Sequence, residues 1–148
     1  VHTGNGPAAL DILQTLAGAG VAPEAYVWVH AQSESDRPTH DWAARQGTWL
    51  EFDGVGWGSL DGHVNAVVDM KRRGRLRQVL VSQDAGWYHV GEPGGGHYQP
   101  HTTLFDRFVP ALQDRGFTED DIRTLLVDNP ARAFAVGVRR LGPSRSPA

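Results

Sequence analysis

The sequence predicts an α/β fold built on a parallel sheet, and three observations lead to this prediction. Short apolar runs with β-branched residues alternate four times with segments whose apolar residues recur at helical spacing. Glycines end most of the helical segments, which sets them apart from the strands, and the alternation implies a parallel sheet joined by right-handed crossovers. Three of the strand-like runs lead into a side chain that can bind a metal, which is how an α/β barrel assembles a site at the carboxyl ends of its strands.

The apolar runs predict strands at residues 1–3, 26–30, 48–52 and 78–82. Helices are expected at residues 7–18, 39–46, 60–73 and 103–115. Thr118 then opens a helical run in a capping box with Asp121 at its third position, and Pro130 begins a short terminal helix after a break at residues 128–130. A long loop follows the fourth strand over residues 85–100. The expected domain spans residues 1–140, and the segment 141–148 is expected to be a disordered tail.

The composition indicates one folded domain of 148 residues with a formal net charge of −3. This mild acidity gives no footprint for nucleic acid, and the basic segment 71–77 fits a solvated helix end. The absence of cysteine excludes disulfides and thiolate zinc sites, and no apolar run approaches the ~20 residues of a membrane span. Val1 is not a methionine and enters a strand without a lead-in. We therefore expect a piece of a longer protein, with the compartment open and the cytoplasm favoured.

His2, His30 and Asp84 form the main candidate site, because each follows a different predicted strand. Neutral imidazole is a common zinc ligand, and a carboxylate at the end of a buried strand is costly to desolvate unless it has a partner. In this arrangement Asp84 would bind a metal and accept a proton from metal-bound water, so it is the predicted catalytic residue. The alternatives are two core histidines bonded to the backbone and an aspartate that caps a turn or pairs with an arginine.

Aromatic side chains gather in the two loops that follow the third and fourth strands. Four of them are expected to line an apolar substrate pocket: Trp57, Trp87, Tyr88 and Tyr98. His97 and His101 have i, i+4 spacing, but Pro100 lies between them and three glycines precede them, so loop histidines that face solvent or substrate are the default interpretation.

The segment Gly4–Ala9 matches the dinucleotide-binding pattern G-x-G-x-x-A before a predicted helix. Pro7 removes one N–H from the turn that would bind phosphate, and the next strand ends at His30, where that pattern requires an acidic residue. A plain strand-to-helix turn is therefore the favoured interpretation.

Four segments, in this order and spacing, resemble the phosphotriesterase family of the amidohydrolase superfamily, which includes phosphotriesterase-like lactonases. They are Val1-His2-Thr3, the strand-ending His30, Val79-Leu80-Val81-Ser82-Gln83-Asp84 and Leu125-Leu126-Val127-Asp128-Asn129-Pro130-Ala131-Arg132. The resemblance covers residues 1 to about 137 and implies a TIM (β/α)8 barrel of which this chain is roughly strands five to eight. It also implies a centre of two divalent ions, Zn²⁺ in the favoured case, with His2 and His30 on the more exposed ion and Asp84 on the more buried one.

The resemblance implies a hydrolase that cleaves an ester, lactone or phosphotriester bond of a small molecule through a metal-bridging hydroxide. The family's other ligands, an H-x-H pair and a bridging carboxylated lysine, would lie upstream of Val1, so the isolated chain is expected to show little or no turnover. Gly54 stands where phosphotriesterases carry a relay histidine, and Ser33, Glu34 and Asp36 replace the family's aspartates after His30. These differences favour a lactonase or another ester-type hydrolase. The rival hypothesis is a non-catalytic half barrel, either inert or completed as a homodimer.

Overall fold

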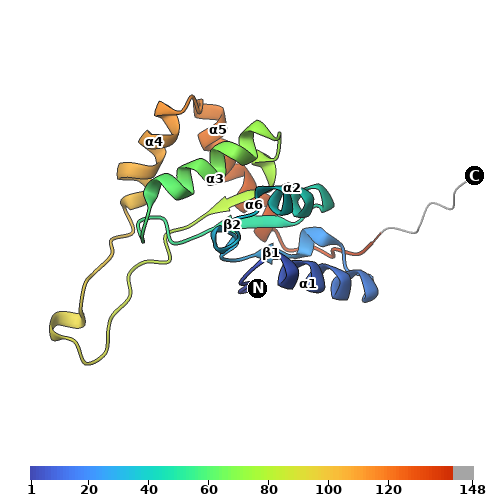
Figure 1. Ribbon diagram of the computed structural model, residues 1–148, viewed down its shortest axis with the longest axis horizontal. Helices are drawn as coiled ribbons and strands as arrows, with labels where there is room; N and C mark the ends of the chain where they lie inside the picture. The colour runs from blue at the N-terminus through green and yellow to red at the C-terminus, as the bar shows by residue number, and fades with distance from the viewer. Residues whose placement is uncertain (142–148) are drawn as a thin grey trace, which may run out of the picture.

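The computed structural model describes residues 1–141 and is built on a three-stranded parallel sheet in the order β1-β2-β3 (Figure 1). The strands are β1 Val27–Trp28, β2 Trp49–Phe52 and β3 Val79–Val81. Val27 lies opposite Trp49, and Leu50 lies opposite Val79, so the register runs evenly across the sheet. The predicted α/β class with parallel strands is confirmed.

The strand expected at residues 1–3 is a single parallel bridge between His2 and Val29. Val29 N–H donates to Val1 O at 3.1 Å, and Thr3 N–H donates to Val29 O at 3.2 Å. These bonds place the first residues alongside β1, in the position of a neighbouring strand, but they are too few to form one.

Three helices fall where the sequence predicts them, within one or two residues: α1 Gly6–Gly18, α2 Arg37–Gln46 and α3 Leu60–Arg72. Each begins after a residue whose side chain accepts a backbone N–H of the first turn, namely Asn5, Asp36 and Ser59. The helix α2 begins before the predicted Thr39, because Asp36 caps it and Pro38 fits the first turn. Short 3₁₀ turns that the sequence did not predict occur at η1 Pro23–Ala25, η2 Ala31–Ser33, η3 Leu76–Gln78 and η4 Pro93–Gly95.

The helix predicted at residues 103–115 consists of a π-helical segment, η5 Leu104–Phe108, followed by α4 Val109–Asp114. In the run after Thr118 an α-helical turn comes first, and the π-then-α order follows it: α5 Glu119–Arg123, η6 Thr124–Asp128 and α6 Asn129–Phe134. Pro110 and Pro130 lack the N–H that an α-helix needs and crowd the preceding turn, so a widened turn before each proline keeps the helix continuous. The predicted break at residues 128–130 is therefore wrong, whereas the capping box of Thr118 and Asp121 is confirmed.

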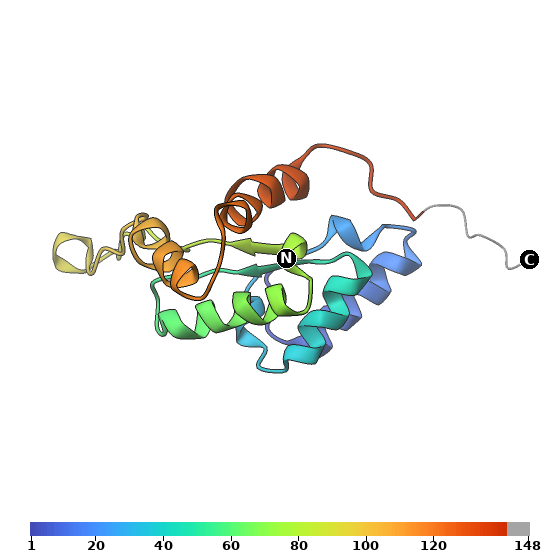
Figure 2. The same ribbon diagram turned by 90° about the horizontal axis from the view of Figure 1, so that it is seen from above.

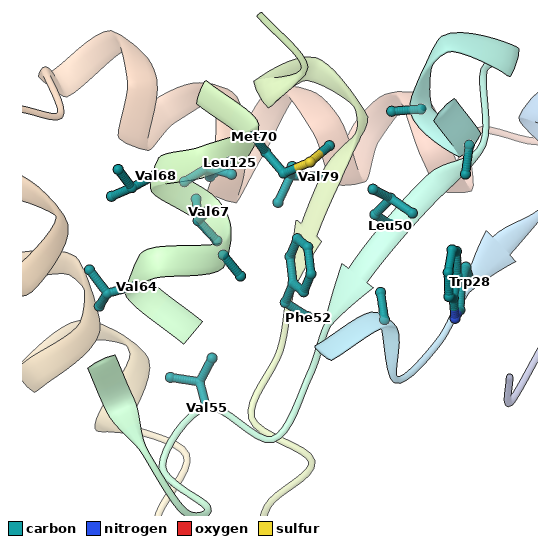
Figure 3. Packing of buried hydrophobic residues seen from close by; sticks show 14 of the residues in the cluster. Trp28, Leu50, Phe52, Val55, Val64, Val67, Val68, Met70, Val79 and Leu125 are labelled. Carbon is teal, nitrogen blue, oxygen red and sulfur yellow. The ribbon is translucent and has the colours of Figure 1, made fainter. Parts of the chain in front are cut away.

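The core lies on both faces of the sheet, because successive residues of β2 point to opposite sides. Leu50 and Phe52 are fully buried in the larger apolar cluster, where Figure 3 shows Val67 and Met70 of α3 near them. Trp49 belongs to a smaller cluster on the other face together with Leu80 and Ala133. Figure 2 shows the corresponding layers, with α1 to α3 on one side of the sheet and the terminal helical segment, in red, on the other.

Two buried or partly buried contacts fasten the later helices to this core. Asn129, at the start of α6, is fully buried and donates through Nδ2 to Leu76 O at 2.8 Å and to Val79 O at 2.7 Å. Lys71, in the basic segment at the end of α3, donates to Asp121 at 2.7 Å and to Gly116 O at 2.8 Å. The lysine thus pairs with the capping box instead of standing free in solvent.

The long loop after β3 forms an arm that projects from the body of the molecule (Figure 1). Its two sides are joined by backbone bonds from Gly86 N–H to Gln99 O at 3.1 Å and from His89 N–H to Gly95 O at 2.9 Å. Of the predicted tail, only Leu141 lies within the described residues. None of the helices in the described part of the chain has the length and apolarity that a membrane crossing requires.

Candidate metal centre

The structure brings the two predicted histidine ligands together at one rim of the sheet. His2 Nδ1 and His30 Nε2 are 3.2 Å apart, and the rings meet edge to face with centroids 4.5 Å apart. His30 directly follows the bridge at the end of β1 and adopts a left-handed conformation with φ of 65°. This conformation is uncommon outside glycine, so the surrounding contacts must hold His30 in it.

The segment that carries His2 is anchored on both sides of the imidazole. Val1 donates its amino group to Val27 O at 2.8 Å. Thr3 is buried, its hydroxyl lies 2.7 Å from the Tyr26 hydroxyl, and its carbonyl accepts the Trp28 indole N–H at 3.3 Å. Because its neighbours are fixed, the exposed His2 ring keeps its place beside His30.

A buried carboxylate lies behind His30. Asp53, which follows β2, is 3% exposed, and its Oδ2 lies 2.7 Å from His30 Nδ1. Its Oδ1 accepts a hydrogen bond from Gln32 Nε2, and its backbone carbonyl lies 2.6 Å from His63 Nε2. We did not single out Asp53 from the sequence, although it stands after the third predicted strand just as His30 stands after the second.

The spacing of the two imidazoles fits a shared metal ion. Two nitrogens that each lie 2.0–2.1 Å from a tetrahedral zinc are about 3.3 Å apart, close to the separation of His2 and His30. Within residues 1–141 no group of three or more histidine, cysteine or acidic side chains is arranged to hold a metal. The described residues therefore supply a pair of imidazoles, and a complete site needs further ligands.

The structure does not group Asp84 with the two histidines. Asp84 is exposed, lies beyond the end of β3 and has φ of 44°, which is again the left-handed region. Its backbone carbonyl accepts two indole N–H groups, from Trp57 and from Trp87, both at 2.8 Å. The two loops that follow β2 and β3 are thus joined at Asp84, and the role of its carboxylate as ligand and base stays a prediction.

The four aromatic residues predicted to bind substrate are all exposed, by 37–73%. Trp57 and Trp87 meet at the Asp84 carbonyl, whereas Tyr88 packs against Gly95, where an added Cβ would lie 2.4 Å from its ring. A surface groove of about 510 Å³ occurs elsewhere, between α1 and α2. Its lining includes Trp42 and none of the four aromatics, so their substrate role also stays a prediction.

The other histidines separate into buried and exposed ones. His40 is fully buried, lies 2.8 Å from Ala31 O through Nε2 and contacts the Trp28 and Phe52 rings edge to face. Burial lowers the pKa of His40, and the bond to Ala31 opposes this only in part, so the ring is neutral in the folded protein. His97 in the arm and His101 directly after it are exposed, as expected of loop residues.

The amino end of α1 already holds an anion from the protein itself. Glu34 accepts N–H groups from Asp36 at 2.7 Å and from Gly6 at 2.8 Å, and these bonds lower the pKa of its carboxyl. A Cβ added at Gly6 would lie 2.7 Å from Thr39 Cγ2, which shows how closely the chain packs here. The carboxylate occupies the position where a dinucleotide phosphate would bind, which favours the plain turn.

Comparisons with known proteins agree on one family. Residues 1–134 match the sequence profile described as Phosphotriesterase family. A phospho-furanose lactonase of Mycoplasmopsis synoviae is 28% identical over 95% of this chain and 42% of its own length. An N-acetyltaurine hydrolase of Danio rerio is 26% identical over 89% of this chain and 42% of its own length.

Solved structures give the same result. A phosphotriesterase structure from Mycobacterium tuberculosis has a TM-score of 0.75 and 28% identity, covering 86% of this chain and 42% of that one. A lactonase from Listeria monocytogenes has a TM-score of 0.74 and 25% identity, covering 87% of this chain and 41% of that one. The sheet described above thus matches TIM-barrel proteins over part of their length, and the chain spans about 42% of the relatives that it matches.

Proposed function

Because the chain belongs to the phosphotriesterase family, we propose that it is the C-terminal half of a metal-dependent hydrolase, corresponding roughly to barrel strands five to eight. The substrate class is a small ester, lactone or phosphotriester. Relatives named as a lactonase and as an N-acetyltaurine hydrolase support a carbonyl substrate over a phosphotriester. The observation that carries the proposal is the pair of imidazole nitrogens 3.2 Å apart at the strand ends.

Each residue has a defined part in this proposal. His2 and His30 bind the more exposed of two divalent ions, zinc in the favoured case, and Asp84 is a ligand of the more buried one. When bound, such ions supply Lewis acidity and make water acidic enough to ionise near neutral pH. Asp84 accepts the proton of the attacking water through its carboxylate. Trp57, Trp87, Tyr88 and Tyr98 border the substrate from the two loops.

Zinc titration of the 148-residue chain tests the metal part of this proposal. We expect binding in competition with a chromophoric chelator, and we expect His2→Ala and His30→Ala each to weaken it at least about tenfold, since each removes one of few ligands. Asp84→Ala should also weaken binding, whereas His97→Ala, in the exposed arm, is the matched control and should not. Absence of zinc binding by the unchanged chain would refute the proposed centre, and so would His2→Ala and His30→Ala variants that bind zinc as tightly as the unchanged chain does.

The second candidate is a non-catalytic half-barrel module, either inert or completed as a homodimer, and two observations favour it. The described residues provide only two grouped ligands, and within residues 1–141 no strand pairs with the outer edge of β3, an exposure that proteins usually avoid. In either case we propose little or no turnover by this chain alone. Light scattering separates the alternatives: a dimer that binds zinc supports a completed barrel, and a monomer that binds none supports the inert module.

A further inference from the structure

The carboxylate of Asp53 is the best-buried charged group near the two imidazoles, and it is not among the proposed metal ligands. We propose that Asp53 is a positioning residue, which fixes the tautomer and orientation of His30 so that the bare Nε2 faces the ion shared with His2. The expected effect on metal affinity rests on the metal centre proposed above. The tautomer itself can be observed without any metal.

The tautomer follows from the hydrogen bond at the other ring nitrogen. A carboxylate only accepts hydrogen bonds, so the 2.7 Å contact of Asp53 Oδ2 requires a proton on His30 Nδ1. A neutral imidazole carries one such proton, which leaves Nε2 with its lone pair. In the opposite tautomer a lone pair would face a buried anion, an arrangement that the 3% exposure of Asp53 makes costly.

Asp53 can perform this role because it is itself held from three sides. Its backbone leaves the end of β2, and its carbonyl is fixed at 2.6 Å from His63 Nε2 on α3. Gln32, two residues after His30, donates to the second carboxylate oxygen. Each carboxylate oxygen therefore has one donor, one from His30, the residue that precedes η2, and one from Gln32 within η2.

The same contacts account for the backbone of His30. His30 has a left-handed conformation, and the bonds from His30 and Gln32 to one carboxylate stabilise it. A second group that orients a metal-binding imidazole in this way typically changes metal affinity by about 10–100-fold when it is removed. We expect the same range here.

Two variants of the full 148-residue chain test the inference. Asp53→Ala removes both acceptors, so we expect His30 to lose its preference for the Nδ1–H form and zinc affinity to fall about 10–100-fold. Asp53→Asn keeps the shape but offers one acceptor oxygen to two donors, so we expect a smaller loss of about threefold to tenfold. Asp69→Asn is the matched control, because it removes a carboxylate paired with Arg73 on the outer end of α3.

The readouts are long-range ¹H–¹⁵N spectra of the histidine rings without metal and zinc titration with a competing chelator. If the Asp53→Ala variant does not fold, the Asp53→Asn variant tests the inference. Unchanged His30 tautomer and unchanged zinc affinity in a folded Asp53→Asn, equal to the control, would overturn the inference. A shifted tautomer in a chain that binds no zinc would support the positioning role of Asp53 while refuting the metal centre proposed above.

Discussion

Replacing Asn129 by alanine should lower the free energy of unfolding, and the contacts of the Asn129 side chain set the size of the loss. The side chain is fully buried at the start of α6 and donates two hydrogen bonds through Nδ2, to Leu76 O and to Val79 O. These carbonyls lie just before and at the beginning of β3, so the amide ties the terminal helix to the sheet. Asn129 therefore connects α6 to residues that lie about 50 positions earlier in the chain.

The magnitude follows from two lost bonds and a partly empty site. Each intramolecular hydrogen bond contributes about 1 kcal/mol net, and a buried carbonyl left without a partner costs about 1–3 kcal/mol. Leu76 O keeps the Val79 N–H as a second donor, so the cost of losing the Asn129 bond at this carbonyl lies at the low end of that range. The buried Oδ1 of Asn129 has no hydrogen-bond partner among residues 1–141, so its removal costs little. We expect a total loss of about 2–3 kcal/mol in the free energy of unfolding.

Urea denaturation followed by circular dichroism measures this loss, because the midpoint falls while the slope stays constant. Asn129→Asp tests the bonds separately from the packing: it keeps the shape but opposes carboxylate oxygens to two carbonyls, so it should cost at least as much. Asn65→Ala, on the exposed face of α3, is the control and should change stability by less than about 0.5 kcal/mol. A loss in Asn129→Ala no greater than in this control would refute the reasoning.

Two further predictions concern the buried histidine and the indole contacts. His40 is neutral when folded because burial lowers its pKa, whereas the unfolded chain takes up a proton below about pH 6.5. The free energy of unfolding should therefore fall as the pH drops from about 6.5 toward the lowered pKa of His40, by up to about 1.4 kcal/mol per pH unit. Urea denaturation at several pH values measures this slope, and His40→Gln should reduce it. An identical slope in the variant would contradict the assignment. Trp57→Phe and Trp87→Phe each remove one hydrogen bond to the Asp84 carbonyl, which contributes about 1 kcal/mol. Hydrogen exchange of the backbone amides in residues 84–100 should therefore accelerate about fivefold in each variant. Unchanged exchange in both would show that the indoles do not hold the loop.

The fold could be predicted well where local patterns decide it. The helix α3 and the strands β2 and β3 follow directly from apolar spacing, and the capping box at Thr118 was read from sequence. The π-helical turns were missed, because they depend on how the helix accommodates Pro110 and Pro130 without breaking. The first strand was overestimated, because strand formation needs paired neighbours along its length, and the chain offers one bridge at His2.

The candidate site could be predicted in part. The rule that ligands follow parallel strands correctly brought His2 and His30 together. It did not place Asp84, since the conformation of a loop after a strand is set by contacts such as the two indoles that sequence spacing does not reveal. The same rule, applied to the third strand, would have found Asp53, and we missed it because a lone aspartate in a glycine-rich loop also reads as a turn residue.

The anchoring of residues 1–3 has a consequence for how an ion would be captured. Thr3 is locked into the interior by Tyr26 and Trp28, so the chain on either side of His2 has already given up its freedom when the protein folds. An arriving cation would then need only to displace solvent and rotate two rings slightly, with no further ordering of the backbone. If the proposed centre binds an ion, capture at this rim should accordingly cost little conformational entropy.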